Sequence, residues 1–190
     1  MTKKLLFILL IIVLNHNSSF SQENPIVLGN ARFTIITPEL VRLEYAVNAK
    51  FVNEPTLFAA NRDTRCNDFE VSTKKNGWTQ ISTSRMRIEY DNDGFPPGRS
   101  NFKIFYKSKG KKKEFRINDK NDKSKNLGGT VETLDGLNGR FELDNGLLSR
   151  AGWFIINDDY KPVLKNGWIE NRSKESIMDR YFFAYDTDYK

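Results

Sequence analysis

The sequence is poor in the side chains on which many catalytic and metal sites depend. Among its 190 residues it has one histidine, His16, and one cysteine, Cys66. His16 falls in an N-terminal segment that we expect to be removed, so the mature chain is predicted to lack an imidazole base or ligand. Cys66 has no cysteine to pair with and no histidine to activate it, and we interpret it as a structural thiol. We therefore predict no bound metal and no cofactor.

Several motifs of nucleotide-binding and hydrolytic proteins are missing as well. The sequence has no Gly-x-x-x-x-Gly-Lys phosphate loop, no His-Glu-x-x-His motif, no Cys-x-x-Cys pair and no Gly-x-Ser-x-Gly motif. Ser149 has no base partner in the mature chain, so a serine nucleophile is not expected. Carboxylates and aromatic rings remain as the groups that a binding site would use.

Long apolar runs are confined to the N-terminus. Residues 5–14 are all apolar, follow Lys3 and Lys4, and precede the small residues Ser19 and Ser21. This pattern is typical of a secretory signal peptide, and ten residues are too few to span a bilayer. We predict a signal peptide over residues 1–21, and hence a secreted or periplasmic protein without a membrane anchor. An uncleaved N-terminal anchor is the alternative.

The positive charge of the chain is modest and local. The net charge is +6, from 30 Lys and Arg against 24 Asp and Glu; removal of Lys3 and Lys4 with the leader leaves 28 − 24 = +4. Five lysines crowd around Gly110, at positions Lys107, Lys109, Lys111, Lys112 and Lys113. Aromatic residues do not alternate with these lysines, as a nucleic-acid stacking platform would require. We interpret the cluster as a solvated hairpin tip and predict no nucleic-acid partner.

The mature sequence reads as a succession of short strands with almost no helical period. Apolar alternation marks residues 41–47, 86–90 and 102–107, and Asn166-Gly167 between two short apolar runs indicates a hairpin. Turn signals separate these runs at regular intervals. We predict an all-β domain over residues 22–185, either an antiparallel β-sandwich or an open barrel.

The least generic stretch covers residues 126–159, where glycines lie between apolar residues. Trp153 begins an apolar run that ends at Asn157, Asp158 and Asp159. Such a strand could present two acids at the rim of a site, or it could lead into an ordinary solvated turn. Carboxylates beside aromatic rings suit saccharides, because acids bind hydroxyls and rings cover the apolar face of a sugar. Asp158, Asp159 and Trp153 are therefore the candidate substrate-binding residues.

Several segments resemble one family, in chain order. They are residues 126–136 (Asn-Leu-Gly-Gly-Thr-Val-Glu-Thr-Leu-Asp-Gly), 146–159 (Gly-Leu-Leu-Ser-Arg-Ala-Gly-Trp-Phe-Ile-Ile-Asn-Asp-Asp), 31–45, 55–62 and 178–190. Together they are similar to the amino-terminal domain of glycoside hydrolase family 31, which contains α-glucosidases and α-xylosidases. The resemblance implies a galactose-mutarotase-like β-sandwich, with residues 186–190 starting the connection to a catalytic (β/α)₈ barrel.

The family carries out retaining hydrolysis with two aspartates of that barrel, so the resemblance implies no catalytic residue in this chain. It also implies that the loop at residues 156–160 enters the sugar pocket, where Asp158 or Asp159 would hold substrate hydroxyls. The expected function is thus a non-catalytic sandwich of a secreted α-glycosidase that contacts an α-linked oligosaccharide. The alternative is a stand-alone carbohydrate-binding or surface interaction module. The surface that would meet the barrel is expected around residues 181–185.

Overall fold

The computed structural model describes residues 23–121, 125–129 and 135–189. The predicted signal peptide lies outside these ranges, as do residues 130–134 of the glycine-rich stretch. Within the described ranges the chain forms β-strands and short 3-10 turns, such as Val47–Ala49, and no α-helix. The same residues include no helix with the length and apolar character needed to cross a bilayer. The all-β class is therefore confirmed.

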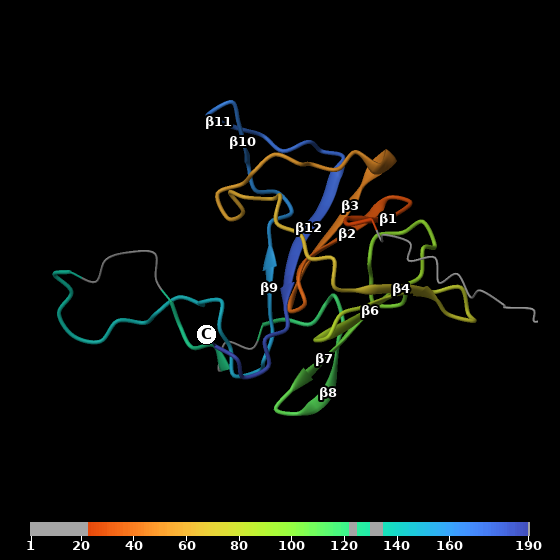
Figure 1. Ribbon diagram of the computed structural model, residues 1–190. Helices are drawn as coiled ribbons and strands as arrows, with labels where there is room; N and C mark the ends of the chain where they lie inside the picture. The colour runs from red at the N-terminus through yellow and green to blue at the C-terminus, as the bar shows by residue number, and fades with distance from the viewer. Residues whose placement is uncertain (1–22, 122–124, 130–134, 190) are drawn as a thin grey trace, which may run out of the picture.

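The first sheet has five antiparallel strands in the order β1-β2-β3-β12-β9 (Figure 1). Its strands are β1 (Ile26–Leu28), β2 (Ala31–Thr37), β3 (Leu40–Ala46), β12 (Ser176–Phe183) and β9 (Phe154–Asn157). β12 is the last strand of the chain and pairs with β3 on one side and β9 on the other. Strands from the beginning and the end of the domain, β3 and β12, are therefore paired in the middle of this sheet.

The second sheet is a meander in which each strand pairs with the next along the chain. Its strands are β4 (Glu70–Thr73), β5 (Thr79–Ser82), β6 (Met86–Tyr90), β7 (Phe102–Ser108) and β8 (Lys111–Phe115). A separate hairpin consists of β10 (Val163–Lys165) and β11 (Trp168–Glu170). Its turn is at Asn166 and Gly167, as the sequence predicted.

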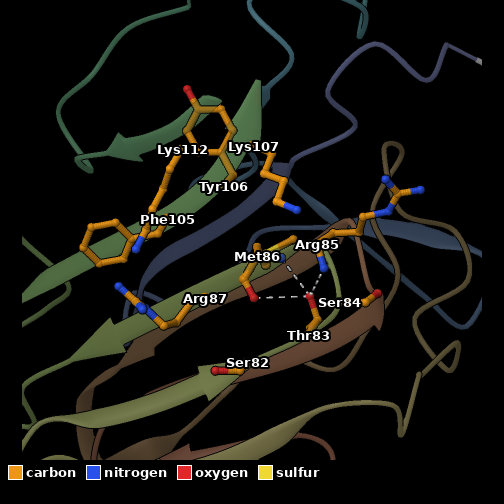
Figure 2. A pocket seen from close by; sticks show the side chains of 10 residues that line it. All are labelled: Ser82, Thr83, Ser84, Arg85, Met86, Arg87, Phe105, Tyr106, Lys107 and Lys112. Atoms are coloured by element: carbon orange, nitrogen blue, oxygen red, sulfur yellow. Dashed lines mark hydrogen bonds between the residues drawn. The ribbon is translucent and has the colours of Figure 1, made fainter. Parts of the chain in front are cut away.

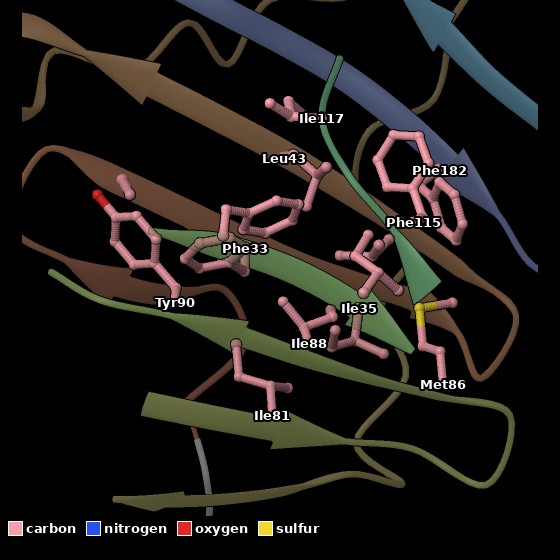
Figure 3. Packing of buried hydrophobic residues seen from close by; sticks show 14 of the residues in the cluster. Phe33, Ile35, Leu43, Ile81, Met86, Ile88, Tyr90, Phe115, Ile117 and Phe182 are labelled. Atoms are coloured by element: carbon pink, nitrogen blue, oxygen red, sulfur yellow. The ribbon is translucent and has the colours of Figure 1, made fainter. Parts of the chain in front are cut away.

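The two sheets pack face to face around one apolar core, which makes the domain a β-sandwich (Figure 3). Alternate residues of each strand point inward, so Phe33 and Leu43 of the first sheet meet Ile88 and Phe102 of the second. The rings of Phe33 and Phe102 are stacked with their centroids 6.2 Å apart. Of the two architectures left open by the sequence, the sandwich is the one observed.

Strand boundaries near charged residues differ from the prediction. β12 begins at Ser176, five residues before the aromatic run that starts at Tyr181. β8 contains Lys111, Lys112 and Lys113, so the turn is confined to Lys109 and Gly110. In both strands the polar side chains conceal the alternation, because hydrogen bonds between backbones form regardless of side-chain charge.

The outer face of the first sheet is buried, which the alternation in β3 did not predict. Arg42 and Glu44 alternate with the apolar residues of this strand, yet they are 5% and 2% exposed. A polar segment, residues 50–66, covers them: the backbone oxygen of Val52 accepts hydrogen bonds from both Arg32 and Arg42. The periodicity of a strand predicts which residues share a face, but it does not predict whether another segment of the chain covers that face.

Gly152 connects the glycine-rich stretch to the end of the chain and tolerates no side chain. Its φ is +78°, and a Cβ atom would lie 2.9 Å from the backbone oxygen of Asp186. We expect Gly152→Ala to lower the free energy of unfolding by more than about 2 kcal/mol, because strain and overlap add. Gly77→Ala is the control, since its φ is +85° but nothing lies within 4 Å. Urea denaturation measures the free energy of unfolding of both variants. Equal losses in Gly152→Ala and Gly77→Ala would contradict the predicted overlap at Gly152.

Candidate functional site

The end of β9 places Asp158 and Asp159 inside the protein. They are 1% and 3% exposed, so the ordinary solvated turn is not what is observed. Asp159 forms an ion pair with Arg180 at 2.8 Å and accepts a 2.8 Å hydrogen bond from the backbone N–H of Asp179. These contacts engage both oxygens of Asp159. Asp159 is thus held as a structural group at the junction of β9 and β12.

Asp158 is held through one oxygen only. Its Oδ2 accepts hydrogen bonds from Thr56 Oγ1 at 2.9 Å, from Arg62 Nη2 at 2.9 Å and from Arg172 Nη2 at 3.3 Å. Its Oδ1 is buried and has no hydrogen-bond partner among the described residues. A buried carboxylate oxygen without a donor costs free energy, so each such atom requires an explanation. Of the two acids, only Asp158 therefore has a carboxylate oxygen that could accept a further hydrogen bond.

Asp158 belongs to a larger cluster on the outer face of the first sheet, which we name the ion-pair network. Its members are Arg32, Arg42, Arg62, Arg172, Glu44, Asp158 and Asp179. Asp179 is at the centre and is fully buried. It accepts two hydrogen bonds from Arg42, at 2.8 and 2.9 Å, and one of 2.6 Å from Arg172. The network ties β3 and β12 to the segments that cover them.

The two aspartates of the network have opposite pKa shifts. Burial would raise the pKa of Asp179, but the hydrogen bond and charge of Arg42, with Arg62 and Arg172, outweigh it and hold that pKa below its ordinary value. Burial raises the pKa of Asp158 above its ordinary value, and the hydrogen bond from Thr56 offsets only part of the rise. Asp179 therefore stabilises the fold as an anion, whereas Asp158 gains from any donor that a ligand brings to it.

A hollow of about 290 Å³ opens beside Asp158. Besides Asp158 it is lined by Leu57, Phe58, Ile156, Asn157, Lys161 and Pro162. The ring of Phe58 packs edge-on against Tyr181, with centroids 5.1 Å apart, which fixes one wall. The hollow thus combines an acid and an amide with an aromatic ring and aliphatic surface. This combination suits a ligand that has both hydroxyl groups and an apolar face.

Trp153 does not lie with the two acids. Its ring stacks on Phe182, with centroids 5.9 Å apart, and lies 5.1 Å from that of Phe115 in the core. Ile156, by contrast, lines the hollow on the other face of the sheet. The reason is the alternation along β9, which sends odd-numbered residues inward and Ile156 outward. The structure therefore brings Asp158 to the hollow, leaves Asp159 beside it in an ion pair, and separates Trp153 from both.

Sequence reasoning missed several residues of this site. Three residues of irregular segments hold Asp158: Thr56 and Arg62, which are 102 and 96 positions away in the chain, and Arg172, which is 14 away. The apolar pair Leu57 and Phe58 in a polar segment was the one signal available. No cluster of three or more Cys, Asp or Glu side chains placed to hold a metal occurs within the described ranges.

The exposed apolar surface is also in a different place from the one expected. Tyr181 and Phe182 are buried, so residues 181–185 are not an open patch. Large exposed side chains lie instead near the hollow and on the β10–β11 hairpin, where Tyr160, Trp168 and Ile169 are 80%, 75% and 64% exposed. The aromatic run near the C-terminus is buried because Phe182 fills the core and Tyr181 packs against Phe58 on the opposite face of the sheet.

Comparisons with known proteins do not place the chain in a family. No protein-family model matches the sequence, and no curated protein is similar to it. The resemblance to glycoside hydrolase family 31 thus rests on the quoted segments, and any function has to be argued from the fold and from the hollow beside Asp158.

Proposed function

We propose that this chain is the non-catalytic amino-terminal β-sandwich of a secreted α-glycosidase of the family 31 type, in which the Asp158 hollow contacts an α-linked saccharide. Two observations carry the proposal: a hollow that has Asp158 and the ring of Phe58 in its lining, and the buried Oδ1 of Asp158, which has no hydrogen-bond partner among the described residues. Sugar hydroxyls donate hydrogen bonds to a carboxylate, and Phe58 offers a surface for the apolar face of the ring. The resemblance assigns the same loop to the sugar pocket.

The catalytic role is assigned to a barrel and not to this sandwich. A retaining glycosidase needs one carboxylate free to act as nucleophile and another free to exchange protons. Asp159 and Asp179 are instead neutralised by arginines, and Asp158 is bound through one oxygen by Thr56 and Arg62. The side chains of Tyr160 and of Trp168 in the β10–β11 hairpin are exposed, and they form the surface that we assign to contact with the barrel.

Saccharide binding by the hollow is tested by titration. With α-linked glucosyl and xylosyl oligosaccharides, we expect weak binding, with a Kd on the order of millimolar, by calorimetry or NMR. Phe58→Ala is expected to weaken it about tenfold, because a stacked aromatic wall is removed while the ion-pair network stays intact. Asp158→Asn keeps the shape but removes the negative acceptor, and we expect a similar loss.

Phe95→Ala is the matched control, because Phe95 is exposed and lies outside the hollow. Thermal unfolding of each variant separates loss of binding from loss of structure. Binding that is unchanged in both Phe58→Ala and Asp158→Asn would refute the site. Turnover of aryl α-glucosides or α-xylosides that is lost in Asp159→Asn would refute the non-catalytic assignment.

The alternative is a stand-alone secreted carbohydrate-binding or surface interaction module. The same titration discriminates between the two, because a module that works alone has to present its whole site. A Kd below about 0.1 mM, sensitive to Phe58→Ala, would favour the module over a site completed by a barrel. If the folded protein does not bind saccharide at millimolar concentration, a surface interaction module would be favoured over both saccharide-binding functions.

A further inference from the structure

A second hollow, of about 240 Å³, lies on the other sheet between the β5–β6 turn and the β7–β8 hairpin (Figure 2). It has no lining residue in common with the Asp158 hollow. Four cationic side chains line it, and no carboxylate does: Arg85, Arg87, Lys107 and Lys112. We name it the cationic hollow. Its chemistry is opposite to that of the Asp158 hollow, so one ligand group does not suit both.

Strand register places these cations side by side on one face of the sheet. Lys107 of β7 lies directly opposite Lys112 of β8, and Arg87 lies opposite Phe105. Continuing the β6–β7 register by one position brings Arg85 opposite Lys107. Like charges in directly opposite positions repel each other and destabilise a sheet. A row of three cations at this end of the sheet is therefore a cost that a bound anion would relieve.

Nearby acids neutralise only part of this charge. Glu39 pairs with Arg85 at 3.0 Å, and Glu89 contacts Arg87 at 3.1 Å while also binding Lys74 at 2.9 Å. Lys107 and Lys112 form no ion pair within the described part of the chain. Lys112 lies 5.1 Å from the centre of the Phe105 ring, and Arg87 lies 4.4 Å from it. These contacts orient two cations at the hollow without neutralising them.

We propose that the cationic hollow binds the sulfate or carboxylate group of an acidic polysaccharide. Ammonium and guanidinium groups bind such oxyanions by charge-assisted hydrogen bonds, and the hydroxyl of Ser84 adds a neutral donor at the same site. The hollow is smaller than the roughly 300–1,000 Å³ of sites that enclose a whole small molecule. It therefore suits a charged group carried on a longer chain that continues over the surface.

The surroundings favour a polysaccharide over a nucleic acid. A nucleic acid gains much of its affinity for a protein surface by stacking bases on aromatic rings. Arg87 and Lys112 already occupy the ring of Phe105, and Tyr106 is buried. The lysines of this hairpin, interpreted from the sequence as a solvated tip, thus divide between the two faces of β8. Lys112 faces the hollow, whereas Lys111 and Lys113 do not line it.

This division provides a matched pair of variants for the test. Lys107→Gln with Lys112→Gln, and Lys111→Gln with Lys113→Gln, each remove two positive charges from exposed positions of the hairpin. Binding of polygalacturonate and of dextran sulfate is measured by titration at low salt, with neutral dextran, inorganic sulfate and a single-stranded DNA oligonucleotide alongside. Thermal unfolding confirms that both double variants are folded.

We expect one or both acidic polysaccharides to bind, with affinity that falls as salt rises. The Lys107/Lys112 variant should lose at least about tenfold in affinity and the Lys111/Lys113 variant less than about threefold, because only the first pair lines the hollow. Binding of only one polymer tells carboxylate from sulfate, and binding of both shows that the cationic hollow accepts either group. Equal losses in the two variants would show a diffuse charge effect and overturn the proposal. So would binding of neither acidic polymer, or tighter binding of the DNA.

Discussion

Replacing Asp179 with alanine is expected to lower the free energy of unfolding by about 3–5 kcal/mol. Asp179 is fully buried and accepts hydrogen bonds from Arg42 and Arg172, and Arg62 lies 3.2 Å from it. Its removal leaves these guanidinium groups buried with too few acceptors, and that uncompensated charge is the source of the loss. Urea denaturation followed by tryptophan fluorescence measures it.

Two comparisons make this prediction specific. Glu175→Gln breaks the exposed pair between Glu175 and Lys50, and we expect it to cost less than about 1 kcal/mol. The pKa of Asp179 is lowered in the folded state, so its contribution is present above the ordinary aspartate pKa, about 4, and is lost as pH falls further. Asp179→Asn should therefore flatten the acid limb of the stability curve. A loss below 1 kcal/mol with an unchanged acid limb would contradict the role of the network.

Phe182→Ala is expected to cost a similar amount, about 3–5 kcal/mol, for an apolar reason. Phe182 is fully buried in β12, and its ring contacts those of Phe115, Tyr106 and Trp153 at centroid distances of 4.6, 5.8 and 5.9 Å. These rings come from β7, β8 and the residue before β9, so their contacts with Phe182 join the two sheets. Truncation leaves a cavity that rigid neighbouring strands do not fill.

Two further variants, Phe182→Leu and Phe95→Ala, separate the loss of core packing from the general effect of shortening a phenylalanine side chain. Phe182→Leu keeps most of the volume and should lose less than half as much as Phe182→Ala. Phe95→Ala removes the same atoms from an exposed loop and is expected to change stability by less than about 0.5 kcal/mol. If Phe182→Ala and Phe95→Ala had the same effect, the ring cluster would not be the link between the sheets.

The sequence was sufficient for the fold class because several strands of the core alternate clearly. β2 and the inner positions of β3, β6 and β7 are apolar at every second residue, which is the signal that strand prediction uses. The order of the strands was not predictable in the same way. Pairing of β12 with β3 depends on residues more than 130 positions apart, such as Asp179 and Glu44, and no local pattern encodes it.

Of the three candidate residues suggested by the sequence, only Asp158 lines the hollow, and the residues that hold it were not foreseen. Asp158 was identified because it follows an apolar run, but its burial depends on Thr56, Arg62 and Arg172. Whether a carboxylate faces solvent or an arginine depends on tertiary contacts, and single-residue chemistry does not determine it. Trp153 was chosen because an aromatic ring can bind a sugar. Its position in the alternation of β9 instead points its side chain toward the core, where it stacks on Phe182.

The place of β12 in the first sheet has a consequence for how the domain is made. During synthesis on the ribosome, β3 and β9 are both complete before the strand that lies between them, because β9 ends at Asn157 and β12 begins only at Ser176. Until then each presents an edge with unpaired backbone groups, and the ion-pair network lacks its central acid. The first sheet therefore cannot be completed until residues 176–183 have been made, and a nascent chain halted before residue 176 is expected to be sensitive to proteases.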